Sequence, residues 1–228
     1  MRAACLIPAR GGSKRLPRKN VADFEGKPII AWTIAAALES GVFERVTVST
    51  EDEEIAAVSL AAGARVHRRP AALAGDAARV VEVCLDFLDS EAREGRGCEL
   101  LGCLLATAPM RNAADVRAVH ALIEPGKCEF AMAVTTYDLP PLQALRVQKD
   151  GVLQPMWPDL VNARSQDTPS LVVDNGSTYF TVASALRSER TFYGPGLRGF
   201  TMPRERSVDI DESFDLELAR WLAQRRAA

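Results

Sequence analysis

Short apolar segments alternate with longer amphipathic segments over the first 135 residues of the chain. Continuous apolar runs bounded by turn residues are typical of strands buried on both faces, and the amphipathic stretches between them are typical of helices. The alternation predicts an α/β, Rossmann-like fold with a mostly parallel sheet and helices on both of its faces. The expected strands cover 3–7, 45–49, 64–67, 100–106 and 130–136, and the expected helices cover 28–40, 51–62, 77–93 and 113–123.

Local signals define several of these helix ends. Pro28 suits the start of the first helix, and Gly41 suits its end because glycine readily adopts the left-handed backbone found there. We expect Thr50 to cap the second helix, which Gly63 ends. The acidic run 51–54 then falls in the first turn, where the helix dipole favours negative charge, so we interpret it as structural rather than metal-binding.

The regular alternation breaks at Asp138. The segment 138–170 holds five prolines and only short strand-like pieces such as 144–148, which indicates an inserted arm. Trp157 and its apolar neighbours are too hydrophobic for a free tail. With 228 residues and 47% hydrophobic content, the chain is long enough for one sizeable core, so we expect a single domain over 1–228 with this insertion. After the arm, the expected strands are 171–174 and 177–182, and the terminal helix is 214–225.

Composition narrows the class of partner. The net charge of −2 and the pI near 5.8 argue against a general nucleic-acid or membrane surface, so we expect neither partner. The longest apolar stretch, 29–38, is far too short to span a bilayer, and residues 1–9 lack a signal-peptide pattern, which predicts a cytoplasmic protein. The five cysteines include no C-x-x-C pair and are interpreted as reduced core thiols.

Positive charge is concentrated directly after the first strand. Gly11 and Gly12 can turn successive N–H groups toward an anion, and five cationic side chains lie between positions 10 and 19. Open α/β sheets bind ligands at the carboxyl ends of their strands, so this loop predicts a site for a polyanion. A solvated basic loop or a nucleic-acid patch is the alternative. The glycine spacing matches neither the P-loop nor the dinucleotide fingerprint.

A second candidate for chemistry is the carboxylate pair Asp209 and Asp211. In an extended segment, alternate side chains point to one side, so the two carboxylates would lie together. Oxygen ligands without histidine suit Mg²⁺, which uses one or two carboxylates together with phosphate oxygens and water. Capping of the last helix by Asp211 or Ser213 explains the same spacing equally well.

The loop sequence IPARGGSKRLPRKN resembles, over its full length, the signature of the CMP-sialic-acid synthetases, the acylneuraminate cytidylyltransferase family. The resemblance implies a fold of the nucleotide-diphospho-sugar transferase type. It also implies an enzyme that joins CMP from CTP to a nine-carbon 2-keto sugar acid and releases pyrophosphate. Arg10 and Lys19 would then be catalytic, because they neutralise phosphate charge. The nucleotide-binding residues that it implies are Ala9, Arg10, Gly11, Gly12, Ser13, Lys19, Asn20 and Asp76.

The same resemblance assigns the catalytic metal to Asp209 and Asp211, with Mg²⁺ as the expected cofactor. The segments RSQD at 164–167 and DNGSTYF at 174–180 resemble the sugar-acid region of the family, in a version closer to its pseudaminic acid branch. A guanidinium can bind a sugar carboxylate in bidentate fashion. Asn175-Gly176 is also a strong turn signal without any ligand. The sugar-binding residues implied are Thr107, Arg111, Arg164, Gln166, Asn175 and Tyr179.

The chain departs from the family pattern at two places. Leu105 stands where the family often has a glutamine that touches the sugar, and Val80 lies near the place of a usual hydroxyl residue. In the family the arm packs on a second subunit, which implies a homodimer. Two alternatives stay open: a Kdo or other sugar nucleotidyltransferase, and a nucleotide-binding module without catalysis.

Overall fold

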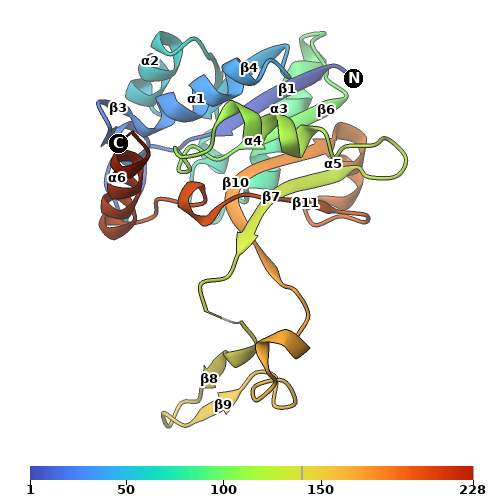
Figure 1. Ribbon diagram of the computed structural model, residues 1–228. Helices are drawn as coiled ribbons and strands as arrows, with labels where there is room; N and C mark the ends of the chain where they lie inside the picture. Colours follow the sequence, from blue (N-terminus) through green and yellow to red (C-terminus); the bar gives the residue numbers. More distant parts are fainter. Residues whose placement is uncertain (140, 228) are drawn as a thin grey trace.

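The computed structural model describes residues 1–139 and 141–227 and is built around a seven-stranded sheet with the order β11-β7-β10-β6-β1-β4-β5 (Figure 1). Only β10 within this sheet runs antiparallel to its neighbours, β6 and β7, so the predicted mostly parallel sheet is confirmed. The strands are β1 (Ala3–Pro8), β4 (Arg45–Thr50), β5 (Arg65–Arg68), β6 (Leu100–Leu104), β7 (Phe130–Thr136), β10 (Val172–Val182) and β11 (Arg198–Thr201).

Helices cover both faces of the sheet. The helices are α1 (Ile29–Ser40), α2 (Glu53–Ala61), α3 (Val80–Arg93), α4 (Ala113–His120), α5 (Ala183–Glu189) and α6 (Ser213–Ala227). Successive β1 side chains point to opposite faces. Cys5 and Ile7 pack in one core cluster with α1, α2 and α4, whereas Ala4 and Leu6 pack in the other with α3 and α5. The predicted two-sided cover is therefore confirmed.

Several element ends differ from the sequence expectations. Thr50 is the last residue of β4, and the cap of α2 is Asp52, whose Oδ1 accepts the Ile55 N–H at 2.9 Å. A carboxylate also complements the positive end of the helix, which favours Asp52 over the threonine. The strands expected on either side of Asn175 form one strand, β10, whose pairing with β7 shifts register between Asp174 and Tyr179.

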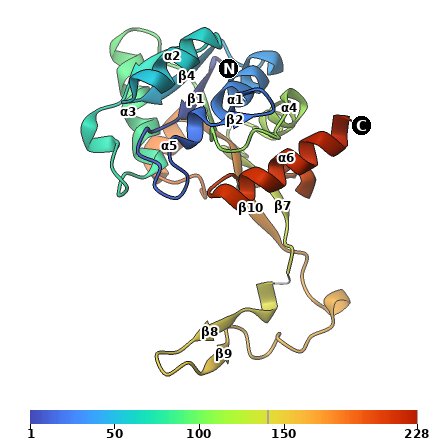
Figure 2. The ribbon, with the colours of Figure 1, turned by 90° about the vertical axis from the view of Figure 1, so that its left-hand side faces the viewer.

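Residues 138–139 and 141–170 extend away from the sheet between β7 and β10 (Figures 1 and 2). This arm contains the hairpin of β8 (Leu145–Val147) and β9 (Leu153–Pro155) and the short 3₁₀ helix η4 (Ser165–Asp167). It carries many exposed apolar side chains. Leu145, Val147, Val152, Leu153, Met156 and Trp157 are each at least 41% exposed.

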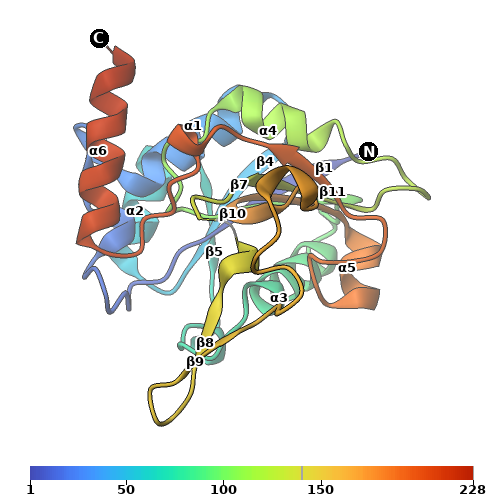
Figure 3. The ribbon, with the colours of Figure 1, turned by 60° about the horizontal axis from the view of Figure 1, so that its bottom comes forward.

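The last helix completes a third, smaller core. Buried Leu216 and Ala219 of α6 pack against Phe24 of β2 (Asp23–Phe24), next to β3 (Lys27–Pro28), at one side of the domain (Figure 3). Ile210, fully buried in the same cluster, anchors the segment that precedes α6. All five cysteines are free, and in the described part of the chain no helix is long and apolar enough to cross a membrane.

Candidate active site

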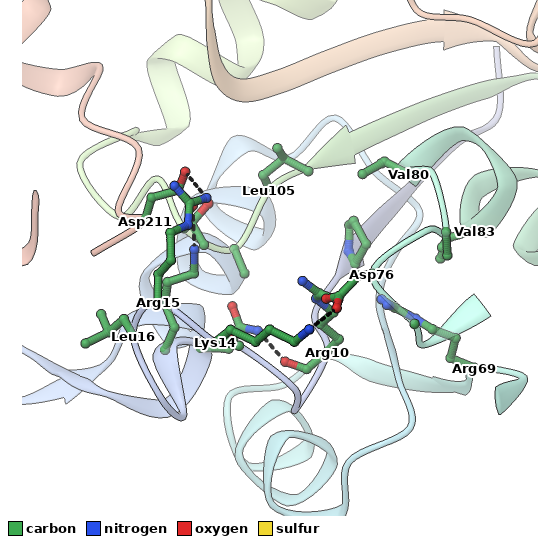
Figure 4. A pocket seen from close by; sticks show the side chains of 18 of the residues that line it. Arg10, Lys14, Arg15, Leu16, Arg69, Asp76, Val80, Val83, Leu105 and Asp211 are labelled. Atoms are coloured by element: carbon green, nitrogen blue, oxygen red, sulfur yellow. Dashed lines mark hydrogen bonds and ion pairs between the residues drawn. The ribbon is translucent and has the colours of Figure 1, made fainter. Parts of the chain in front are cut away.

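A cavity of about 490 Å³ opens where the chain leaves β1 and β6, at the carboxyl ends of these parallel strands (Figure 4). One wall is the glycine loop after β1, and the opposite wall is apolar, with Val80, Val83 and Leu105. Five cationic side chains and two carboxylates line it, which makes it suitable for a polyanion. These charged residues are Arg10, Lys14, Arg15, Lys19, Arg69, Asp76 and Asp211.

The glycine loop packs closely on the start of α2. A Cβ atom at Gly11 would lie 2.4 Å from Asp52 Oδ2, so only glycine fits there without a shift. The Gly11 N–H donates to Glu51 Oε1 at 2.7 Å, whereas Gly12 has open space beside its Cα. We did not predict from the sequence that Glu51 contacts this loop. Its carboxylate accepts the Gly11 N–H, which we expected to face a bound anion.

Four of the five loop cations are paired with the carboxylates of the cavity, whereas Arg18 is paired with Asp52 and Glu54 at the start of α2. Arg10 Nη1 and Lys14 Nζ contact Asp76 at 2.6 and 2.5 Å, and together Lys14 and Arg10 hold the pKa of Asp76 below its ordinary value (Figure 4). On the other side of the cavity, Arg15 Nη2 and Lys19 Nζ contact Asp211 at 2.6 and 2.8 Å. The loop is therefore preorganised, with its positive groups already facing the cavity.

The two carboxylates of the D-x-D segment lie in different environments. Ile210 between them donates its N–H to the Thr107 carbonyl at 2.9 Å, and the Thr107 hydroxyl donates to Asp209 Oδ1 at 2.5 Å. Burial, followed by the nearby charge of Asp211, raises the pKa of Asp209, although Thr107 opposes that shift. Burial also opposes ionisation of Asp211, but Lys19 and Arg15 outweigh it and hold its pKa below the ordinary value.

The side chain that accepts N–H groups at the start of α6 belongs to Asp215 and not to Asp211. Asp215 Oδ2 accepts the N–H groups of Asp211 and Glu212, both at 2.9 Å, and so serves the start of α6. The side chain of Asp211 is thus left to the loop cations. Among the residues that the structure describes, no group of three or more potential metal-ligating side chains occurs. Asp211 lines the cationic cavity, whereas Asp209 lines a second cavity. Two hard carboxylates nevertheless suit a cation that takes its other ligands from phosphate and water.

Three of the expected sugar contacts are interior side chains. Arg111 is 3% exposed and donates to the Ser177 carbonyl at 2.6 Å and to Thr33 Oγ1 at 2.7 Å, and burial lowers its pKa to about 10. Asn175 is 5% exposed, with Nδ2 donating to Ser207 Oγ and Oδ1 accepting from Ser177. Tyr179 is also buried. Since protein groups occupy these polar atoms, their placement counts against direct sugar contacts.

The cavity lining does not include Ala9, Gly11, Gly12 or Asp209. The other expected residues divide between the cavity and the arm. Thr107, Ser13 and Asn20 line the cavity, and Asn20 Nδ2 donates to the Arg10 carbonyl at 2.9 Å. On the arm, Arg164 directly precedes η4 and Gln166 lies within it, and neither lines this cavity. A single chain therefore does not bring the two arm residues together with the rest of the site.

Arg69 lines the cavity, although we did not predict this from the sequence. It is 8% exposed and donates from Nη2 to the Ser49 carbonyl at 2.6 Å, so β4 fixes its direction. Burial lowers its pKa. Its position just after the predicted strand 64–67 could have indicated a ligand contact, because strand ends form the ligand edge of such a sheet.

The model of the cytidylyltransferase family matches residues 4–125 of the chain. A pseudaminic acid cytidylyltransferase from Campylobacter jejuni is 34% identical over 223 residues, which cover 97% of this chain and 96% of that protein. The chain belongs to the cytidylyltransferase family. The family membership inferred from the glycine loop is thereby confirmed, and the protein is a nucleotidyltransferase.

Other members of the cytidylyltransferase family are similarly close. A CMP-N,N'-diacetyllegionaminic acid synthase from Legionella pneumophila is 32% identical, with 98% of this chain and 97% of that protein covered. An N-acylneuraminate cytidylyltransferase A from Danio rerio is 33% identical, with 95% of this chain and 49% of that protein covered.

Solved structures support the fold assignment. A CMP:2-keto-3-deoxy-manno-octonic acid synthetase complexed with CTP has a TM-score of 0.73 at 18% identity, covering 99% of this chain and 100% of that one. A 4-diphosphocytidyl-2C-methyl-D-erythritol synthase from Anaerococcus prevotii has a TM-score of 0.65 at 10% identity, covering 98% and 99%. The expected nucleotide-diphospho-sugar transferase type of fold is confirmed.

Proposed function

We propose that this cytidylyltransferase transfers CMP from CTP to a nine-carbon 2-keto sugar acid of the nonulosonic type and releases pyrophosphate. The observation that carries the proposal is the cationic cavity lined by Asp211 of the D-x-D segment, because it combines a polyanion site with a hard oxygen ligand. Sialic, pseudaminic and legionaminic acids are the candidate acceptors. Pseudaminic acid is favoured by the 34% identical relative and by the segments at 164–167 and 174–180.

In this reaction the anomeric hydroxyl oxygen forms a bond to the α-phosphorus of CTP, and the bond to the bridging oxygen of pyrophosphate breaks. Such transfers depend on positioning and on charge neutralisation more than on covalent help. Lys19 and the glycine loop would hold the phosphates, and Arg10 would stabilise the charge that develops on the leaving pyrophosphate. Asp76 and Asp211 hold these cations at the cavity before the nucleotide arrives.

Asp209 and Asp211 are the residues that would hold Mg²⁺, whose donor preference they match. When bound, the ion would supply neutralising charge to the phosphate oxygens. The Thr107 hydroxyl, 2.5 Å from Asp209 Oδ1, favours the ionised carboxylate that such a role requires.

The arm supports a homodimer as the working state. Arg164 and Gln166 lie away from the cavity of their own chain, and the exposed apolar side chains of the arm are suited to packing against protein. We propose that the arm of one subunit packs on a second subunit and brings these two residues toward its cavity. Because CTP is a cytoplasmic metabolite, the cytoplasm is the proposed place of action.

The test is pyrophosphate release from CTP with Mg²⁺ and a panel of sialic, pseudaminic and legionaminic acids and Kdo, beside a control without sugar. We expect release with a nine-carbon acid and a CMP-sugar product identified by mass. Release with Kdo alone would favour the sister activity. Tight CTP binding without release from any acid would favour a module that has lost catalysis.

A further inference from the structure

The β10 segment carries a cluster in which three donors converge on one carboxylate. Asp174 accepts the Tyr179 hydroxyl at 2.9 Å on each oxygen and the Tyr193 hydroxyl at 2.7 Å on Oδ2. It also accepts the Gly176 N–H on Oδ1 at 2.9 Å. The cluster lies where the pairing of β10 with β7 shifts register, so the backbone at Gly176 is not held by a regular ladder. Side chains hold this turn instead.

The turn lies directly against the predicted metal carboxylate. Gly176 has a φ of +65°, and a Cβ atom there would lie 2.7 Å from Asp209 Oδ2 and 3.2 Å from Asp209 Cγ. The other oxygen, Oδ1, accepts the Thr107 hydroxyl at 2.5 Å. The Asp209 carboxylate is thus held between a hydroxyl on one side and the bare glycine backbone on the other. Its position depends on where the turn places Gly176.

We propose that Asp174 is a positioning residue for Asp209: held by Tyr179 and Tyr193, it binds the Gly176 N–H and so fixes the turn that sets the position of the Asp209 carboxylate. The inference rests on the proposed function for the role of Asp209 in the reaction. It assigns Tyr179 to the support of the site rather than to direct sugar binding. Asn175 supports the turn from its other side, through Ser207 and Ser177.

The two tyrosine hydroxyls of the cluster are suited to holding the Asp174 carboxylate in one position. The bond to Asp174 raises the pKa of Tyr193 to about 12, and burial together with Asp174 raises the pKa of Tyr179 further. Both hydroxyls therefore stay protonated and donate throughout the neutral range. Three donors to one carboxylate, the shortest bond at 2.7 Å from the Tyr193 hydroxyl, allow it little freedom to rotate.

The first test substitutes the glycine at the contact. Gly176→Ala adds a methyl group that must displace the Asp209 carboxylate, and Gly126→Ala is the matched control. Gly126 has a φ of +79° and nothing within 4 Å of an added Cβ, so it meets the same backbone strain without a neighbour to displace. We expect Gly176→Ala to lower kcat for pyrophosphate release by about 100-fold, as a misplacement of about 1 Å can do. Gly126→Ala should stay within about twofold of the unsubstituted protein.

The second readout does not depend on turnover. Mn²⁺ binding is measured by electron paramagnetic resonance with saturating CTP, and CTP binding is measured separately by calorimetry in EDTA. Gly176→Ala should weaken Mn²⁺ binding at least tenfold while CTP binding in EDTA stays unchanged. Equal Mn²⁺ binding by Gly176→Ala and Gly126→Ala would overturn the proposal.

The third test substitutes the side chains that hold the turn. We expect Asp174→Asn, which keeps the shape but cannot accept all three donors, to lower kcat and Mn²⁺ affinity with little change in the KM for the sugar acid. Tyr193→Phe removes one donor from a 64% exposed side chain, so it should fold normally and show a smaller effect in the same direction. A raised sugar KM with unchanged kcat and Mn²⁺ affinity would instead identify Asp174 as a sugar contact.

These outcomes separate the inference from the proposed function. If the unsubstituted protein releases no pyrophosphate with any acid, the proposed function fails, yet the Mn²⁺ affinity of Asp174→Asn beside that of the unsubstituted protein still decides the positioning role. If turnover is present but the variants behave alike, only the positioning role fails.

Discussion

The ion pair between Glu91 and Arg45 should contribute strongly to stability, because it anchors α3 to β4 in the interior. Arg45 Nε donates to Glu91 Oε2 at 2.6 Å, and Arg96 Nη2 donates to Oε1 at 2.7 Å. The side chains of Arg45 and Glu91 are only 9% and 7% exposed. Glu91→Gln would leave the buried Arg45 guanidinium with only the half-exposed Glu44 carboxylate, at 3.4 Å, as a counter-charge.

The expected cost is about 3 kcal/mol, near the lower end for breaking a buried pair, because Arg96 is 40% exposed and can return to water. For a chain of this size that corresponds to a fall in Tm of about 6 to 12 °C. Glu53→Gln is the matched control. It breaks a two-bond pair with Arg68 at 2.7 and 2.8 Å, but both side chains are at least 59% exposed. We expect a much smaller loss there, because water screens an exposed pair.

The effect should also depend on pH in a defined direction. Burial opposes ionisation of Glu91, but Arg96 and Arg45 outweigh it and hold its pKa below the ordinary value. Its contribution is therefore complete above the unfolded-state pKa of about 4.3 and is lost as the pH falls through the lower folded-state value. Urea unfolding at several pH values measures both effects. A difference between Glu91→Gln and the unsubstituted protein that is below about 1 kcal/mol at pH 7 would refute the reasoning.

Three further predictions concern the site. Asp209→Asn should lower kcat by about 1000-fold, measured as pyrophosphate release, with an unchanged Tm, and surviving Mg²⁺-dependent turnover would contradict the metal role. Asp76→Asn should tighten pyrophosphate binding a few-fold in calorimetry without metal, since Arg10 and Lys14 lose a competing partner. Weaker binding would mean that Asp76 contacts the nucleotide. Arg164→Ala should raise the KM for the sugar acid by about 10-fold or more and leave the KM for CTP unchanged.

Features determined by neighbouring residues could be predicted from the sequence. Pro28 and Gly41 bound α1 as expected, because a fixed proline φ and a left-handed glycine act within one turn of the helix. The glycine loop and its cations were recognisable for the same reason, and four of the five cations, Arg10, Lys14, Arg15 and Lys19, line the cavity.

Features that depend on distant contacts could not be predicted in this way. Arg111 follows a strand end, where a ligand contact is reasonable, but its guanidinium points into the core because Ser177 and Thr33 supply acceptors there. The Asn175-Gly176 turn signal is real, yet the chain continues as one strand because β6 and β7 pair with it on both sides. Neither partner is visible from the local sequence.

The place of β10 in the sheet has a mechanical consequence. This strand of 11 residues begins where the arm ends and runs between β6 and β7 through the middle of the sheet (Figure 1). Asp174 is its third residue and pairs with Val134 of β7, so the arm joins the sheet within a few residues of the cluster at Gly176, before the pairing with β6 begins. Only this short stretch of β10 therefore separates the arm from the turn that lies against Asp209.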